Sequence, residues 1–276
     1  MVDNEFGIRD IISVIPDDRM REANRTSLNR LPDISDWYPS SKIDMALRSL
    51  LQPITIHRKA WEYALCMHGL DDLGIVTDTA TAIATGAGTE PPLYHFANRI
   101  KRMVATDLYS FPGNEGTPVM LQDAKQFAPF PYREQNLEVY QMAGDALNFR
   151  DDTFDFTFCL SSIEHFGSRA TIRASLDEMV RVVRPGGILC IITELILTGH
   201  TDSEYFTWEE IDDIFLKHRG IEMVGGAPDL SISESHVRYP VDLVHSQNIN
   251  HSPHVVLKRG DMLWTSFSMF FRKVAS

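Results

Sequence analysis

The chain has 276 residues, of which 43% are hydrophobic, and it carries a formal net charge of −12. This length and apolar content are enough for one large core, so one α/β domain with additions is favoured over two domains. The negative charge argues against a nucleic-acid partner, because a protein that binds the phosphate backbone needs a basic stripe. The densest basic spots, at 57–59 and 99–102, are short and are predicted to be solvated faces.

Cysteine usage and the chain ends favour a cytoplasmic protein. The three cysteines, Cys66, Cys159 and Cys190, are too few for a disulfide framework and are predicted to be buried thiols in a reducing compartment. The N-terminal MVDNEFGIRD is acidic and polar, unlike a signal peptide. The longest apolar run, 187–197, is interrupted by Glu194 and is too short to span a bilayer.

The first part of the chain predicts an arm and a helical cap. Residues 1–36 show no regular pattern, and we expect a mobile arm or a segment that orders on another subunit, which leaves a homodimer open. Apolar residues at helical spacing predict helices over 41–51 and 58–70. We therefore assign residues 1–73 to an N-terminal arm and cap that packs on a following sheet.

Residues 80–90, ATAIATGAGTE, predict a strand that runs into a glycine turn and then into a helix. Gly86 permits a tight turn, and Gly88 lets a ligand approach the backbone closely. The dinucleotide pattern G-x-G-x-x-G fails, because Pro91 stands at the third glycine. Glu90 also places a carboxylate at the helix N-terminus, where a pyrophosphate would have to bind. The turn therefore favours a nucleoside ligand without phosphates and with positive charge, such as S-adenosylmethionine.

Two further strand ends carry acidic residues that suit a nucleoside. The segment RMVATD ends in Asp107, 19 positions after Gly88, where a carboxylate can accept hydrogen bonds from both ribose hydroxyls. A strand over 137–142 leads into the sequence GDA. There Asp145 can accept a hydrogen bond from an adenine amino group, and the Ala146 amide can donate to a ring nitrogen.

The rest of the chain alternates strands and helices, which requires a parallel sheet with right-handed crossovers. The Pro- and Gly-rich linker 110–136 is longer than a minimal crossover, so we expect a surface excursion there. The pattern then predicts a strand at 154–160, a helix at 174–184, a strand at 187–195, a capped helix at 207–219 and strands at 221–226 and 266–274.

Five motifs in this order, GAGTE, VATDLY, GDAL, FDFTFCLSSIEHF and VRVVRPGGIL, resemble those of the class I S-adenosylmethionine-dependent methyltransferases, in particular the group with a type 11 methyltransferase core. The resemblance covers roughly residues 79–197 and implies a methyltransferase domain over 74–276. It implies an α/β, Rossmann-like fold, with a seven-stranded, mostly parallel sheet, an antiparallel last strand and helices on both faces. One departure is the pair Ala84-Thr85, because the family often has an acidic residue just before the first glycine.

The resemblance and the strand ends together give a set of candidate cofactor residues. They are Gly86, Ala87, Gly88, Glu90, Asp107, Leu108, Asp145, Ala146, Ser161 and Ser162.

The implied reaction is direct displacement at the methyl carbon, so the protein has to align the reactants and remove the acceptor proton. His165 directly follows the fourth predicted strand, close to where the sulfonium methyl is expected. We therefore take His165, His254 and Glu194 as candidate catalytic residues. A hydroxyl acceptor needs a base more than a neutral amine does, so these side chains favour methyl transfer to oxygen.

Residues 227–261 form an insertion between the last two predicted strands, and we expect this lid to overhang the acceptor site. Its histidine, hydroxyl and amide side chains favour a polar acceptor such as a saccharide or a glycosylated metabolite, although a solvated surface loop explains them equally. His245, His251 and His254 with Asp242 are of types that can bind a divalent ion such as Mg²⁺. Their spacing matches no zinc-finger or HExxH pattern.

Three functions remain open on the sequence. The first is a small-molecule O-methyltransferase, with an aromatic or polyketide acceptor, methylated on oxygen or nitrogen, as a variant if Trp37, Tyr38, Trp61 and Tyr63 build an apolar pocket. The second is a nicotinamide oxidoreductase, which Glu90 and Pro91 disfavour. The third is a non-catalytic subunit that binds S-adenosylmethionine and serves a partner.

Overall fold

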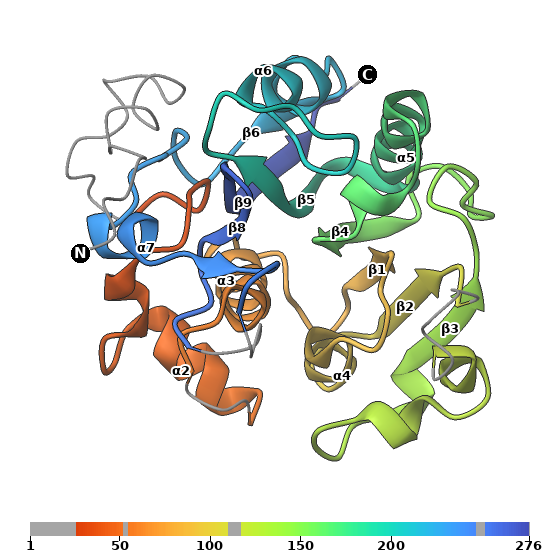
Figure 1. Cartoon of the computed structure of the whole chain (residues 1–276). Helices are drawn as coiled ribbons and strands as arrows, with labels where there is room; N and C mark the ends of the chain where they lie inside the picture. The colour runs from red at the N-terminus through yellow and green to blue at the C-terminus, as the bar shows by residue number, and fades with distance from the viewer. Residues whose placement is uncertain (1–25, 52–54, 110–116, 247–251, 276) are drawn as a thin grey trace.

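A nine-stranded sheet flanked by helices forms the body of the protein in the computed structural model (Figure 1), which describes residues 26–51, 55–109, 117–246 and 252–275. Its strands are β1 (Thr81–Thr85), β2 (Arg102–Asp107), β3 (Leu137–Gln141), β4 (Phe154–Leu160), β5 (Val183–Ile196), β6 (Ile221–Met223), β7 (Val241–Asp242), β8 (Leu257–Arg259) and β9 (Met262–Lys273). The helices are α2 (Lys42–Ser49), α3 (Arg58–Asp72), α4 (Pro91–Ala97), α5 (Arg169–Val182), α6 (Trp208–Ile211) and α7 (Glu234–Arg238). Short helical turns are η2 (Ile34–Trp37), η3 (Thr117–Leu121), η4 (Ala124–Phe127), η5 (Glu134–Asn136), η6 (Ile163–His165) and the π-helical η7 (Asp212–Leu216).

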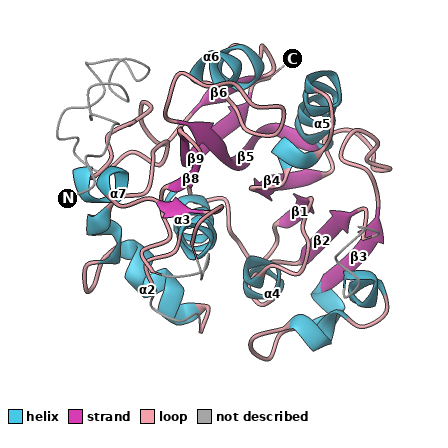
Figure 2. Ribbon diagram, viewed as in Figure 1, coloured by secondary structure: helices cyan, strands magenta, loops and turns pink. Residues whose placement is uncertain are grey.

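The sheet order is β3-β2-β1-β4-β5-β9-β8-β7, and β6 pairs with β9. Strands β1 to β5 are parallel, whereas β9 runs antiparallel to β5. Helices α3 and α4 cover one face of the sheet, and α5 and α6 cover the other (Figure 2). The predicted mixed, Rossmann-like α/β fold is thus confirmed. Because the chain order reverses between β1 and β4, their carboxyl ends border a crevice of the kind that binds ligands in open sheets.

The sheet has two more strands than the seven predicted, because the insertion after β6 adds β7 and β8. Strand β8 pairs with β9, and β7 pairs with β8, so both extend the sheet beyond its antiparallel strand. The segment was predicted to be a lid over the acceptor site. Its described parts instead include these edge strands and α7, and residues 247–251 lie outside the described residues.

Local signals explain most element boundaries. Thr207 and Glu210 form the predicted capping box, and α6 then continues as the π-helix η7. Helix α5 ends at Val182, two residues before the predicted end at residue 184, and β5 begins at Val183. The described part of the linker, 117–136, forms the turns η3, η4 and η5, which is consistent with a surface excursion.

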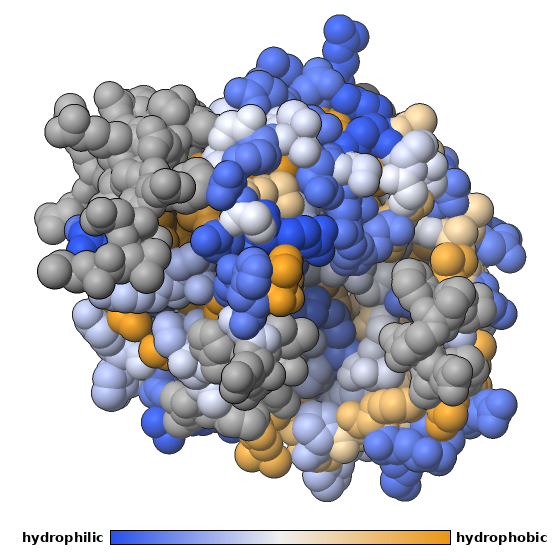
Figure 3. All heavy atoms as spheres, viewed as in Figure 1, coloured by the Kyte–Doolittle hydropathy of each residue, from blue (hydrophilic) through white to orange (hydrophobic). Residues whose placement is uncertain are grey.

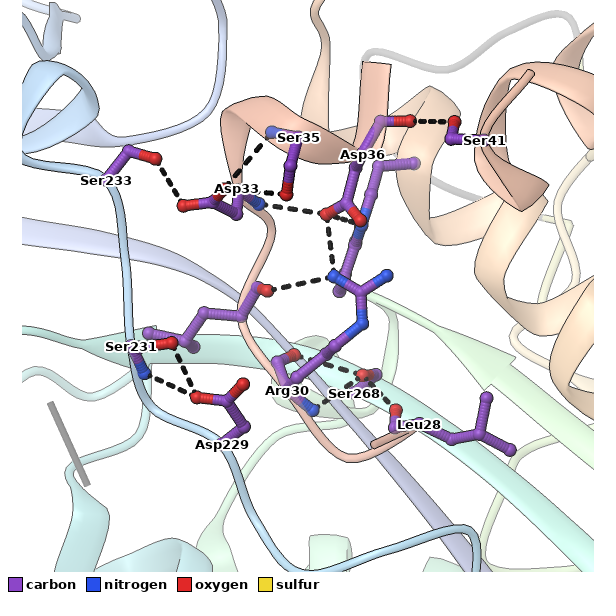
Figure 4. Close-up of polar contacts among 12 residues, drawn as sticks. Leu28, Arg30, Asp33, Ser35, Asp36, Ser41, Asp229, Ser231, Ser233 and Ser268 are labelled. Atoms are coloured by element: carbon purple, nitrogen blue, oxygen red, sulfur yellow. Dashed lines mark hydrogen bonds and ion pairs between the residues drawn. The ribbon is translucent and has the colours of Figure 1, made fainter. Parts of the chain in front are cut away.

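The N-terminal segment packs against its own chain (Figure 4). The Leu28 amide donates to Gly225 O at 2.8 Å, just after β6. Arg30 Nη1 donates to Asp36 Oδ2 at 2.7 Å, and Trp61 Nε1 of α3 donates to the same oxygen at 2.8 Å. The described part of the predicted arm, 26–36, is therefore held by a buried polar network, and residues 1–25 lie outside the described residues.

The core lies on both faces of the sheet. Cys66, Cys159 and Cys190 are all buried and free, as predicted. Within the described ranges, no helix is long and apolar enough to cross a membrane.

Candidate functional site

The glycine turn after β1 is closed by contacts from two other strand ends. Gly86 and Gly88 have φ angles of +67° and +48°, in the region that favours glycine. A Cβ on Gly86 would lie 2.6 Å from Ser162 Cβ and 2.9 Å from the ring of Phe166, both of which follow β4. Asp107, at the end of β2, accepts a hydrogen bond from the Gly88 amide at 2.9 Å. The turn, the acidic strand end and the loop after β4 therefore meet at the carboxyl edge of the sheet.

A cavity of about 400 Å³ opens at this edge. Figure 3 shows that the face of the molecule is hollowed near its centre. This volume lies within the range of small-molecule sites. The cavity is lined by Lys59, Tyr63, Gly86, Gly88, Glu90, Asp107, Leu108, Met142, Ala143, Gly144, Asp145, Ser162, His165, Phe166, Thr171 and Ser175.

Most of the sequence-predicted cofactor residues border this cavity, namely Gly86, Gly88, Glu90, Asp107, Leu108, Asp145 and Ser162. Three others lie beside it and use their amides within the fold. The Ala87 amide donates to Thr106 O at 3.0 Å, the Ala146 amide to Ala143 O at 3.1 Å, and the Ser161 amide to Ile192 O at 2.7 Å.

Sequence reasoning missed Lys59, which α3 brings to the cavity together with Tyr63, a residue predicted for an apolar acceptor pocket. The prediction of a solvated basic face at 57–59 is wrong, because the Arg58 and Lys59 side chains are only 16% and 31% exposed. Both cations can be partly buried because neighbouring carboxylates compensate their charge. Glu62, within one helical turn, is the local signal that could have indicated this. The other carboxylates come from distant elements, so no local pattern points to them.

These cations form a chain of ion pairs that leads to the cavity. Arg58 Nη1 pairs with Glu194 and lies 3.2 Å from Glu62 Oε1. Lys59 Nζ lies 3.1 Å from Glu62 Oε2 and 3.1 Å from Glu90 Oε1. Burial raises the pKa of Glu90 to about 7, although the Lys59 charge opposes this shift. Burial likewise raises the pKa of Glu194, against the charge of Arg58.

Among the three candidate catalytic residues, His165 lines the cavity. Its Nδ1 lies 2.8 Å from Glu204 Oε1, and both side chains are about 40% exposed. Glu194 is buried in its pair with Arg58. His254 is buried beside α3, where its ring stacks on that of His57 with the ring centroids 4.1 Å apart. The structure therefore does not bring Glu194 and His254 to the cavity wall.

Comparison with known proteins agrees with this geometry. A family model described as a methyltransferase domain matches residues 84–191, from β1 to β5. A chain from the complex of the Haloferax volcanii Trm112 methyltransferase activator with an assigned methyltransferase superposes with a TM-score of 0.51 and 16% identity, covering 85% of this chain and 97% of that one. A protein assigned as a sarcosine dimethylglycine methyltransferase from Galdieria sulphuraria also gives 0.51, with 13% identity and coverage of 90% and 93%. Residues 84–191 therefore belong to a methyltransferase domain, and the chain has the fold of the class I S-adenosylmethionine-dependent methyltransferases. No curated protein matches this chain.

The domain offers no metal centre within the part of the chain that the structure describes. No group of three or more His, Cys, Asp or Glu side chains there is arranged to hold an ion. His245 pairs with Asp242 at 3.1 Å on the surface, apart from the buried His254. His251, the remaining candidate ligand, lies outside the described residues.

The described residues of the predicted lid, 227–261, contact the start of α3 and do not line the cavity. The His254 carbonyl instead accepts the Arg58 amide at 2.7 Å, and the His254 amide donates to Ile56 O at 2.8 Å. These bonds fix the start of α3, from which Lys59 enters the cavity wall.

Proposed function

We propose that this methyltransferase transfers a methyl group from S-adenosylmethionine to a hydroxyl of a small molecule. The observation that carries the proposal is the His165–Glu204 pair, with Nδ1 and Oε1 2.8 Å apart, in the wall of the cavity at the glycine turn. An imidazole oriented by a carboxylate is the usual form of a general base near neutral pH.

The residues around the cavity fit the chemical groups of the cofactor. Each carboxylate oxygen of Asp107 accepts one hydrogen bond from a backbone amide, Oδ2 from Gly88 and Oδ1 from Tyr109. Further lone pairs on both oxygens remain for ribose hydroxyls. We assign the adenine to the rim formed by Leu108 and Asp145.

S-adenosylmethionine supplies a methyl group that its sulfonium already activates. The chain therefore has to orient the acceptor and take its proton. With the Nδ1 proton of His165 donated to Glu204, Nε2 of the same ring carries the lone pair that accepts the hydroxyl proton. The carboxylate of Glu204 then faces the imidazolium and stabilises it, as in other base–carboxylate pairs.

The acceptor is proposed from the hydroxyl and imidazole side chains in the cavity wall, namely Ser162, His165, Thr171 and Ser175. A saccharide or a glycosylated metabolite is the acceptor that we propose first, because each of its hydroxyls needs a polar group to pair with. The competing acceptor is a phenol or polyketide. Of the four aromatic residues proposed for it, Tyr63 lines the cavity, Tyr38 is exposed, and Trp37 and Trp61 are buried in the core.

A panel assay tests the proposal. Purified protein and S-adenosylmethionine are incubated with mono- and oligosaccharides, phenols, catechols and primary amines, and adenosylhomocysteine release is measured against a blank without acceptor. We expect turnover on hydroxyl acceptors, with saccharides first. Turnover on amines alone would contradict oxygen transfer. Tight cofactor binding with no turnover on any class would favour a non-catalytic binding subunit.

A further inference from the structure

The buried ion pairs at α3 form one alternating chain of charges. In order, it runs Glu194, Arg58, Glu62, Lys59, Glu90, so each cation lies between two carboxylates. Three carboxylates thus share two cations. All three are almost fully buried, with Glu62 inaccessible and Glu194 and Glu90 at 3% and 8% exposure. This series of ion pairs therefore has one negative charge in excess, in a region where charge is poorly solvated.

The unmatched end of this chain lies at the cavity. Glu90 lines the cavity, whereas Glu62 and Glu194 do not. Glu90 also stands at the N-cap of α4, yet its side chain makes no capping hydrogen bond to that helix. The carboxylate is turned toward Lys59 instead, at 3.1 Å.

Lys59 cannot neutralise Glu90 alone, because its three donors are divided. They go to Glu90, to Glu62 and to the Leu160 carbonyl, the last at 2.6 Å. The other charged or titratable groups that interact with Glu90 are Glu62, Tyr63 and Cys66 of α3, Asp107 of β2, Tyr109, and Cys159 of β4. Among these neighbours, two are carboxylates and none is a further cation, so the position next to Glu90 inside the cavity favours positive charge.

We propose that Glu90 recognises the sulfonium charge of the methyl donor, so that the site binds S-adenosylmethionine more tightly than adenosylhomocysteine, in which the sulfur is an uncharged thioether. This inference rests on the proposed function, since it assigns the donor to this cavity. The sulfonium of the donor adds a positive charge after Glu90, at the cavity end of the alternating chain of charges. Loss of the sulfonium charge on transfer leaves Glu90 unmatched again, which promotes release of adenosylhomocysteine.

The test is direct binding, measured by calorimetry without any acceptor. S-adenosylmethionine and adenosylhomocysteine are titrated into the full chain, into Glu90→Gln and into Glu138→Gln. The last variant is the matched control, because Glu138 pairs with Arg102 outside the cavity and its loss changes the net charge equally. We expect Glu90→Gln to weaken the sulfonium cofactor by about tenfold or more and the thioether by less than about twofold. Glu138→Gln should change neither.

A second measurement uses the unaltered protein. Between about pH 6 and about pH 8, deprotonation of Glu90 should raise the preference for the sulfonium form over the thioether, and its binding should release protons into the buffer. Equal weakening of both ligands in Glu90→Gln, or a preference that does not change with pH, would overturn the role of Glu90. Failure of the unaltered protein to bind either ligand would overturn the proposed function, and this inference with it.

Discussion

His165 Nδ1 and Glu204 Oε1 lie 2.8 Å apart, although Glu204 follows His165 by 39 positions in the chain. His165 closes the turn η6 after β4, and Glu204 lies in the loop between β5 and α6. The carboxylate fixes the ring at the cavity wall through Nδ1 and leaves Nε2 available. This pairing connects the two loops that follow the neighbouring strands β4 and β5.

Replacement of His165 by Gln should lower kcat by about 10²- to 10⁴-fold on a hydroxyl acceptor, because proton removal is lost. Affinity for S-adenosylmethionine should stay within about twofold, since the glycine turn and Asp107 are unchanged. The matched control is His218→Gln. It removes an imidazole that pairs with Asp177 at 3.0 Å outside the cavity, and turnover should be retained. Full activity of the His165 variant would reject this assignment.

Asp107→Ala should weaken S-adenosylmethionine by about 1–3 kcal/mol, because charge-assisted bonds to the ribose are lost. Part of this loss has a second origin, since the carboxylate also holds the Gly88 amide. Asp107→Asn keeps an oxygen that can accept from that amide, so a comparison of the two variants by calorimetry separates the contributions. Unchanged affinity in a folded Asp107→Ala protein would exclude a ribose contact.

Gly86→Ala should destabilise the fold by about 2–4 kcal/mol, through the left-handed backbone and the overlap with Ser162 and Phe166. Gly74→Ala isolates the backbone contribution. Its φ is +70°, but a Cβ there meets no atom within 4 Å, so about 1 kcal/mol is expected. Urea denaturation of both variants measures the difference. Equal losses would show that Gly86 serves only the turn and not the close packing.

Stability should fall as pH rises through neutrality, owing to Glu164. Burial, with the charge of Glu194 adding to it, raises the pKa of Glu164 to about 8. Because the pKa of Glu164 is higher in the folded state than in the unfolded state, protonation of Glu164 stabilises the folded protein. The contribution of Glu164 to the free energy of unfolding is therefore complete below about pH 4.5 and declines up to about pH 8.

The Glu164→Gln side chain stays neutral at every pH, so the variant should be more stable than the unaltered protein at about pH 8.5. The difference in the free energy of unfolding between variant and unaltered protein should be about 1–3 kcal/mol larger in favour of the variant at about pH 8.5 than at about pH 5.5. The amide can still serve the hydroxyl of Thr193, which bonds Glu164 at 2.8 Å. Denaturation curves at both pH values provide the measurement. Glu222→Gln, at an exposed position of β6, is the control and should show no such difference. A parallel pH dependence in all three proteins would contradict a protonated Glu164.

The sequence alone predicted the features that depend on short stretches of chain. The glycine turn at Gly86, the acidic strand end at Asp107 and the order of strands and helices all follow from backbone preferences and apolar periodicity. In a parallel sheet the carboxyl ends share one edge, so the contact of Asp107 with the turn, at a cavity that His165 also lines, could be expected. The roles of the individual cofactor and catalytic residues remain predictions.

Only the tertiary structure decided where the charges lie. Arg58 and Lys59 look like a solvated basic spot in the sequence, but their partners Glu90 and Glu194 arrive from α4 and β5. Likewise, His254 looks like a residue of an acceptor lid, but it lies against His57 at the start of α3. Periodicity reports which face of an element is apolar. It carries no information on which distant charge will be buried opposite another, because that is set by the packing of α3 on the assembled sheet.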